Sequence, residues 1–178
     1  MKKDFIMPVT VLTLLCLIMA GALALVNNIT YPVIKEAAAE RAYIARKEII
    51  PQAEEFILLE PDRELIPETV AEIYAANNNT GYIFIVYTYG YGGSIKLICG
   101  IDPDGKIIKS KILAHTETQG LGTIVFDRAV SYEGQDADFA YNLDAIAGST
   151  ITSNAYKNAV LDAFAAFEII KEGEYSHE

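Results

Sequence analysis

The sequence predicts an α+β domain, with an antiparallel sheet and flanking helices, that follows a single N-terminal transmembrane helix. Three observations support this prediction: an uncharged apolar run near the N-terminus, β-type segments in the middle, and a helical apolar pattern near the C-terminus. The chain has 178 residues, which is enough for one ordinary domain with a small appendage.

Composition excludes several classes of protein. Hydrophobic residues make up 52% of the chain and charged residues 21%, which excludes a disordered protein. The net charge of −10 gives no general attraction to a phosphate backbone, so we do not expect nucleic acid as a partner. Two cysteines and two histidines are too few for a disulfide scaffold, an iron–sulfur cluster or a cysteine-rich zinc site, so we expect no metal site.

The apolar run covers residues 5–26 and contains no charged side chain. As a helix it is about 33 Å long, enough to cross a hydrocarbon core of about 30 Å. Lys2 and Lys3 precede it, and positive charge remains on the cytoplasmic side of a membrane. We therefore predict that residues 1–27 form a cytoplasmic tip and a single span of the plasma (inner) membrane. The remaining chain then lies on the extracytoplasmic side.

A cleaved signal peptide and a lipoprotein signal are the alternatives for this run. Residues 22–24 fit a small-x-small cleavage site, but the apolar run is longer than the hydrophobic part of most signal peptides. Two leucines precede Cys16 where a lipoprotein signal has small residues, so we set that alternative aside. We expect Cys16 to be an inert apolar residue of the span and Cys99 to belong to the core of the domain.

Residues 28–50 are expected to form a helical stalk. Thr30 is a candidate N-cap, Pro32 lies near the expected start, and Pro51 ends the helical pattern. The stalk either only separates the domain from the lipid or also packs on the domain, and we favour the second alternative. The domain itself then covers residues 51–178.

The β-type segments predict an antiparallel meander. Residues 82–89, 94–101 and 106–113 are rich in β-branched, aromatic and other apolar side chains, and Gly-rich or Pro-Asp-Gly turns separate them. Two further short elements are expected within residues 52–59 and 68–76, where prolines act as breakers.

The chain is expected to close with a helix that begins at Asn154, a plausible N-cap, and stops at Gly173. Apolar residues at helical spacing form its core face. They are Val160, Ala163, Phe164, Phe167 and Ile170.

Two segments contain more hydrogen-bonding groups and glycines than folding alone needs. Residues 115–122 combine polar side chains with two glycines that let backbone N–H groups approach a flat or anionic ligand. Residues 144–154 place four hydroxyl side chains and a glycine before the last helix, whose N-terminus favours a phosphate. The alternatives are an ordinary polar loop for the first segment and an N-cap at Ser153 or Asn154 for the second.

The two segments together resemble a known family. The order HTETQGLG, then about two dozen residues, then DAIAGSTITSN is similar to the FMN-binding domain family shared by RnfG and NqrC, subunits of the Rnf and sodium-pumping quinone reductase complexes. The stretch GYGGSIKLICGIDPDGKI and the single N-terminal anchor are also similar to that family. The resemblance implies a covalent FMN whose phosphate is esterified to Thr150, with Asp144 as the leading acid of the motif. Thr152 is the neighbouring candidate.

The resemblance also implies a set of cofactor-binding residues and no catalytic residue. Glu117 and Thr118 are candidates for polar contacts with the isoalloxazine ring, and Leu121 for an apolar one. His115 either donates to a reduced flavin or is an ordinary loop histidine. The complete predicted set is Thr150, Asp144, Gly148, Ser149, Ile151, Thr152, Ser153, His115, Glu117, Thr118, Gly120, Leu121 and Gly122.

The function implied is that of an electron-transfer subunit of a membrane-bound Rnf complex, an ion-translocating ferredoxin:NAD oxidoreductase. The subunit relays electrons between partner redox centres and has no stand-alone catalysis. Its expected partners are the other membrane and redox subunits, membrane lipid, and a flavin transferase for maturation. Three alternatives remain open: the matching subunit of a sodium-translocating quinone reductase, a non-redox binding or assembly module, and a free-standing flavin reductase.

Overall fold

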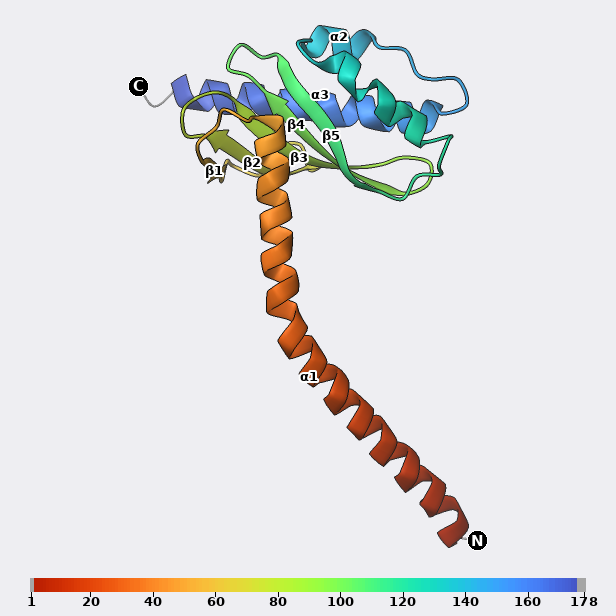
Figure 1. Ribbon diagram of the computed structural model, residues 1–178. Coiled ribbons are helices and arrows are strands. Elements are labelled where there is room, and N and C mark those ends of the chain that lie inside the picture. The colour runs from red at the N-terminus through yellow and green to blue at the C-terminus, as the bar shows by residue number, and fades with distance from the viewer. Residues whose placement is uncertain (1, 176–178) are drawn as a thin grey trace. The chain divides into compact units, whose positions relative to one another are not determined.

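The computed structural model describes residues 2–175, with side chains described for residues 6–127 and 132–173. The chain divides into two compact units, Met1–Ile44 and Ala45–Glu178. The first unit is part of one long helix, and the second contains the sheet and the remaining helices (Figure 1). The predicted α+β class is confirmed.

Helix α1 runs without interruption from Lys2 to Ile49. An 18-residue stretch of this helix has a mean hydropathy of 2.7, and none of its residues is buried. The helix is therefore long and apolar enough to cross a membrane. The expected start of a separate helix at Thr30 is wrong. The Thr30 hydroxyl donates to the carbonyl of Val26 (2.9 Å) and so bonds back within the helix instead of capping a new one. Pro32 lies inside the same helix.

The last turn of α1 belongs to the second unit and is packed against the sheet. Ile49 and Ile50 are 1% and 2% exposed, and they form a small core cluster with Ile83, Ile85 and Ile98. The end of the stalk is therefore part of the folded domain.

The sheet has five strands in the order β1-β2-β3-β4-β5, and each neighbouring pair is antiparallel. The strands are β1 Phe56–Leu59, β2 Val70–Ala76, β3 Tyr82–Tyr89, β4 Ser94–Ile101 and β5 Ile107–His115. The predicted meander is confirmed, and the two short elements expected before it are strands. The strand predicted over residues 106–113 ends two residues later, so His115 pairs with Ile95 inside the sheet.

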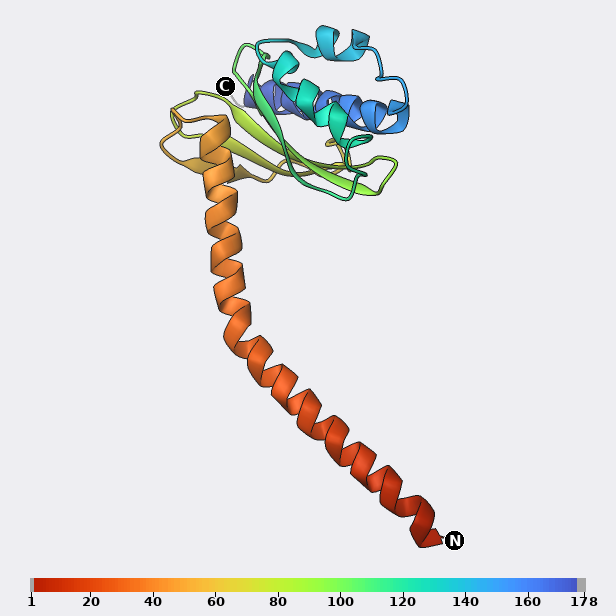
Figure 2. The ribbon, with the colours of Figure 1, turned by 45° about the vertical axis from the view of Figure 1, so that its right-hand side comes forward.

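Three helices complete the described part of the domain. The 3-10 helix η1 covers Thr123–Tyr132, α2 covers Ala137–Asn142, and α3 covers Thr150–Tyr175. Helix α3 lies along one face of the sheet (Figures 1 and 2). The 3-10 helix η1 comes after β5 in the sequence and also contacts it. The helix expected to begin at Asn154 begins four residues earlier, because the Ser153 N–H already donates to the Ser149 carbonyl (2.8 Å). Gly173 does not stop the helix.

The larger core lies between the sheet and α3. Phe84 and Leu97 of the sheet face Tyr156, Val160 and Phe167 of α3, and all five are at most 1% exposed. The apolar face predicted for this helix is confirmed. Cys99 is fully buried in the same core, where burial raises the pKa of its thiol to about 12, so it is a core residue as expected.

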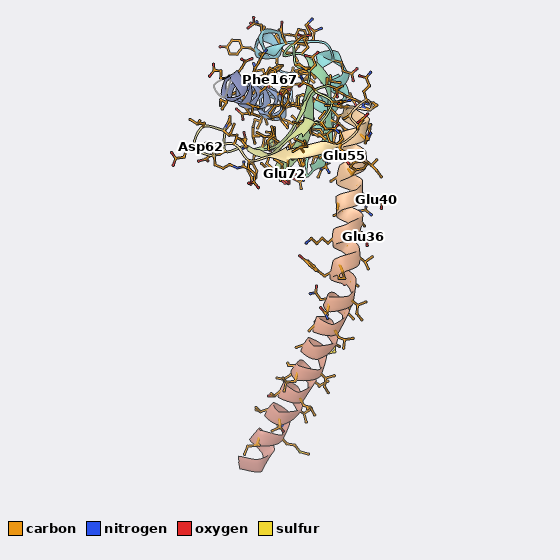
Figure 3. All side chains as sticks on the ribbon, turned by 90° about the vertical axis from the view of Figure 1, so that its left-hand side faces the viewer. Glu36, Glu40, Glu55, Asp62, Glu72 and Phe167 are labelled. Atoms are coloured by element: carbon orange, nitrogen blue, oxygen red, sulfur yellow. The ribbon has the colours of Figure 1, made fainter. Side chains whose placement is uncertain are left out.

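Acidic side chains are spread over the outside of the protein, among them Glu36 and Glu40 on α1 and Glu55, Asp62 and Glu72 on the domain (Figure 3). They contribute to the net charge of −10.

Candidate functional site

A cavity of about 260 Å³ lies where three segments meet: the β3–β4 turn, the loop after β5, and the first turn of α3. Its volume is slightly below the roughly 300–1,000 Å³ of most small-molecule sites. The cavity is lined by Tyr91, Glu117, Thr118, Leu121, Gly122, Gly148, Ser149, Thr150, Ile151 and Thr152.

Glu117 lies in the wall of this cavity and is only 7% exposed. Its Oε1 accepts a hydrogen bond from the Gly92 N–H (3.0 Å), and its Oε2 accepts one from the Thr152 hydroxyl (3.1 Å). The Thr152 Oγ1 in turn accepts from the Tyr91 N–H (3.5 Å). One carboxylate therefore joins the β3–β4 turn to the first turn of α3.

Glycines make room for this carboxylate. A Cβ atom at Gly90 would lie 2.1 Å from Glu117 Oε1, and one at Gly122 would lie 2.2 Å from Glu117 Oε2. A Cβ at Gly92 would come within 2.8 Å of the Glu117 Cα. Any larger residue at these positions would move Glu117 or the loop. The glycines of the β3–β4 turn and of the loop after β5 therefore allow one acidic side chain to pack between them.

Three of the four hydroxyl groups at the start of α3, in residues 149–153, are buried and hydrogen-bonded. Ser149 donates to the carbonyl of Leu121, and Thr152 donates to Glu117 as described. Ser153 Oγ accepts from the Ile146 N–H (3.1 Å). The exposed fractions of these residues are 7%, 1% and 8%. These hydroxyls hold the loops around the cavity together.

Thr150 differs from the other three. It is exposed, it lines the cavity, and none of the residues that the structure describes forms a hydrogen bond with its hydroxyl. It is also the first residue of α3, directly after Ser149, whose carbonyl accepts the first helical hydrogen bond. The N–H groups of Thr150, Ile151 and Thr152 precede that bond, and such groups attract an anion. A phosphate carried by Thr150 would therefore lie at a favourable helix end.

Most of the predicted site residues meet at this cavity, but four do not line it. Gly120 lies in the same loop, and its N–H donates to Thr123 Oγ1 (3.0 Å). Asp144 and Ser153 line a separate small recess behind the first turn of α3. His115 lies in a third recess beside β5, with its ring 5.0 Å from that of Phe126.

Tyr91 is a lining residue that was not predicted from the sequence. It is 73% exposed at the mouth of the cavity, where Leu121 and Ile151 are 52% and 56% exposed. The available signal was an aromatic residue between glycines in residues 90–93, a pattern that by itself predicts only a turn. These three side chains give the cavity an apolar mouth.

Comparison with known proteins connects this region with flavin binding. The FMN-binding domain family matches residues 90–165, a stretch that contains every residue lining the cavity. The chain is 30% identical over 176 residues to the G subunit of the Na(+)-translocating ferredoxin:NAD(+) oxidoreductase complex of Acetobacterium woodii, covering 84% of this chain and 85% of that protein.

Two further relatives cover similar shares. The G subunit of the proton-translocating ferredoxin:NAD(+) oxidoreductase complex of Clostridium ljungdahlii is 29% identical over 168 residues, which is 85% of each chain. The G subunit of the ion-translocating oxidoreductase complex of Methanosarcina acetivorans is 27% identical over 178 residues, covering 91% of this chain and 94% of that protein. These matches support FMN as the cofactor, electron transfer as the role, and a membrane-anchored chain.

Proposed function

Since the chain belongs to the family of the G subunits of ion-translocating oxidoreductase complexes, we propose that it is an electron-transfer subunit whose FMN is esterified through its phosphate to Thr150. A bound FMN supplies reversible electron exchange between partner redox centres. The protein contributes the attachment point, the orientation of the ring and the electrostatic environment.

The observation that carries this proposal is the state of the four hydroxyls at the start of α3. Ser149, Thr152 and Ser153 are buried and already hydrogen-bonded, whereas Thr150 is exposed at the cavity. Esterification at Thr152 would break its bond to Glu117 and force a phosphate into a site that is 1% exposed. Thr150 can carry the ester without any such loss.

The surroundings of Thr150 suit both parts of an esterified FMN. A phosphodiester keeps one negative charge, which the N–H groups and the dipole at the N-terminus of α3 favour. Tyr91, Leu121 and Ile151 offer exposed apolar surface to the isoalloxazine ring, and Thr118 offers a polar group. The helix end then holds the phosphate while the apolar mouth and the neighbouring loop hold the ring.

Maturation requires an enzyme to reach the attachment site. Asp144, Ala147, Gly148 and Thr150 are all exposed, so a flavin transferase can contact the motif on the folded domain. The proposed partners are this transferase, membrane lipid around residues 5–26, and the other subunits of the complex. By homology with the relatives, that complex couples ferredoxin:NAD oxidoreduction to ion translocation, and this subunit contributes no stand-alone catalysis.

The proposed sidedness follows from the charges that flank the apolar run. Lys2 and Lys3 remain in the cytoplasm, and the FMN domain lies on the extracytoplasmic side. A covalent flavin is well suited to that compartment, because a dissociated FMN is not easily replaced there.

In-gel flavin fluorescence of the denatured full-length protein, coexpressed with an active flavin transferase, tests the proposal. We expect a fluorescent wild-type band, a dark Thr150→Ala band, and a fluorescent Thr152→Ala band as the matched control two residues away. A dark wild-type band, with the transferase active on a control substrate, would contradict the proposal and favour a non-redox binding or assembly module. Loss of fluorescence in Thr152→Ala alone would move the ester to Thr152.

A further inference from the structure

Glu117 has an unusual environment for an acidic residue. It is 7% exposed and lines the cavity, yet none of the described residues lining that cavity is a lysine, arginine or histidine. The ion pairs that the structure does show link Glu48 with Lys109 and Lys111, in another part of the domain. Among the described residues, the Glu117 side chain is therefore held by hydrogen bonds and not by an ion pair.

The hydrogen bonds to Glu117 suit a carboxylate. The Gly92 N–H donates to Oε1, and the Thr152 hydroxyl, which accepts from the Tyr91 N–H, donates to Oε2. Both carboxyl oxygens are thus acceptors, as both are in a carboxylate. Glu117 thus places a fixed negative charge in the wall of the cavity.

We infer that Glu117 lowers the redox potential of the flavin by opposing the negative charge that reduction brings into the cavity. This inference rests on the proposed function, because it takes FMN as the occupant of the cavity. A partner redox centre gives up one electron as the flavin gains one, and no bond forms or breaks. The carboxylate disfavours the reduced state because like charges repel.

The expected size follows from Coulomb's law. A unit charge about 10 Å away, at an effective dielectric constant of about 20, changes an equilibrium roughly tenfold. Glu117 and Thr150, the proposed attachment point, line the same cavity, so we expect an effect of about that size. Glu117 is in this sense a positioning and tuning residue: it joins the β3–β4 turn to the first turn of α3 and contributes a charge to the cavity wall.

The test is a redox titration of the flavin in full-length, flavin-loaded protein. Glu117→Gln keeps the size of the side chain and removes the charge. Glu168→Gln is the matched control, since Glu168 is exposed on α3, eighteen residues and about 27 Å along the helix from Thr150. We expect Glu117→Gln to shift the ratio of reduced to oxidised flavin at least tenfold at a fixed potential, which is about 59 mV for a one-electron couple. Glu168→Gln should leave the ratio unchanged.

An unchanged potential in a flavin-loaded Glu117→Gln protein would overturn the inference and leave the proposed function intact. A folded Glu117→Gln protein that takes up no flavin would also overturn it, because the carboxylate would then serve maturation. If that variant does not fold, Gln119→Lys places a cation on the exposed loop that carries Glu117 but outside the lining of the cavity. It should raise the potential while Gln119→Met does not, and equal potentials would reject the inference. A wild-type protein without covalent flavin would remove the proposed function itself, and the inference with it.

Discussion

Helix α3 and the last turn of α1 pack on opposite faces of one sheet, and the start of α3 and the end of α1 are built in opposite ways. Ile49 and Ile50 end α1 and are almost completely buried against apolar residues of the sheet. The start of α3 leaves Thr150 and Ile151 exposed at a cavity. Apolar packing at the end of α1 fixes that helix to the domain. The exposed start of α3, whose first N–H groups have no partner within the helix, is suited to binding an anion.

The acidic residues near the two ends differ in the same sense. Glu48 is exposed and pairs with the Lys111 ammonium at 2.6 Å. Glu117 is buried and accepts hydrogen bonds from one N–H and one hydroxyl. The charge of Glu48 is neutralised by a nearby cation. The charge of Glu117 meets no cation among the described residues that line the cavity, so it acts on whatever occupies the cavity.

The largest effect is expected in the core between α3 and the sheet. Phe167 is 1% exposed and packs edge-on against Tyr82 with ring centroids 5.7 Å apart. Phe167→Ala should lower the free energy of unfolding by about 3–5 kcal/mol, since it removes a buried ring and leaves a cavity. Urea denaturation followed by tyrosine near-ultraviolet circular dichroism measures this, and a loss below about 1 kcal/mol would contradict the assignment of this core.

The corresponding change on the other face is Ile49→Ala. We expect a loss of about 2–5 kcal/mol, because Ile49 is 1% exposed in the smaller cluster. Flavin fluorescence of the denatured protein should stay at the wild-type level, since the attachment site lies on the opposite face. A dark band would contradict this division of roles between the end of α1 and the start of α3. It would show that the end of α1 also supports the flavin attachment site.

Gly122→Ala tests the packing around Glu117. The new Cβ would lie 2.2 Å from Oε2, so Glu117 or its loop must move, at a cost of about 1–3 kcal/mol in the free energy of unfolding. Gly173→Ala is the control with the opposite sign. Its Cβ would meet nothing within 4 Å inside α3, and it should stabilise the protein by about 0.5–1 kcal/mol. Equal effects of the two changes would contradict the close packing of Glu117.

The smallest effect concerns Glu48. The hydrogen bond from Lys111 holds the pKa of this carboxyl below its ordinary value of 4.5. A group with a lowered pKa stabilises the fold above its ordinary pKa, and this contribution is lost as the pH falls through the lowered value. Glu48→Gln should therefore cost at most about 1 kcal/mol at neutral pH. The difference from wild type should close at a pH well below 4.5.

The control for this titration is the same Glu48→Gln change in a Lys109→Gln, Lys111→Gln background, in which both cations near Glu48 are already absent. In that background Glu48→Gln should have no pH-dependent effect on stability. A Glu48→Gln difference that persists in acid would show that packing, and not the ion pair, stabilises this end of α1.

The strands were predictable from sequence because their signals are local. Residues 82–89 and 94–101 are rich in β-branched, aromatic and other apolar side chains and are bounded by turns that contain glycine, and both strands have the predicted bounds. The first turn of α3 was not predictable in the same way. Asn154 is as good an N-cap as Ser149 by residue type, and the choice depends on the contact of Ser149 with Leu121, which is distant in sequence.

The candidate site shows the same limit. The two segments were visible in the sequence, and the structure brings most of their residues to one cavity. The sequence pattern gave no reason to place His115 and Glu117, two residues apart, in different recesses, yet only Glu117 lines the cavity. The register of β5, shifted opposite Lys96 and Leu97, decides which side chains turn inward, and no local pattern encodes that shift. Nor could spacing reveal which hydroxyls are already hydrogen-bonded.

Locating the flavin on the chain tests the proposed attachment most sharply. The wild-type protein, matured with a flavin transferase, is digested with trypsin, and the fluorescent peptide is fragmented in a mass spectrometer. We predict that the peptide between Arg128 and Lys157 carries the mass of FMN less one water, and that fragmentation places this mass on Thr150. The same mass on Ser149, Thr152 or Ser153, or its absence from this peptide, would contradict the assignment of Thr150.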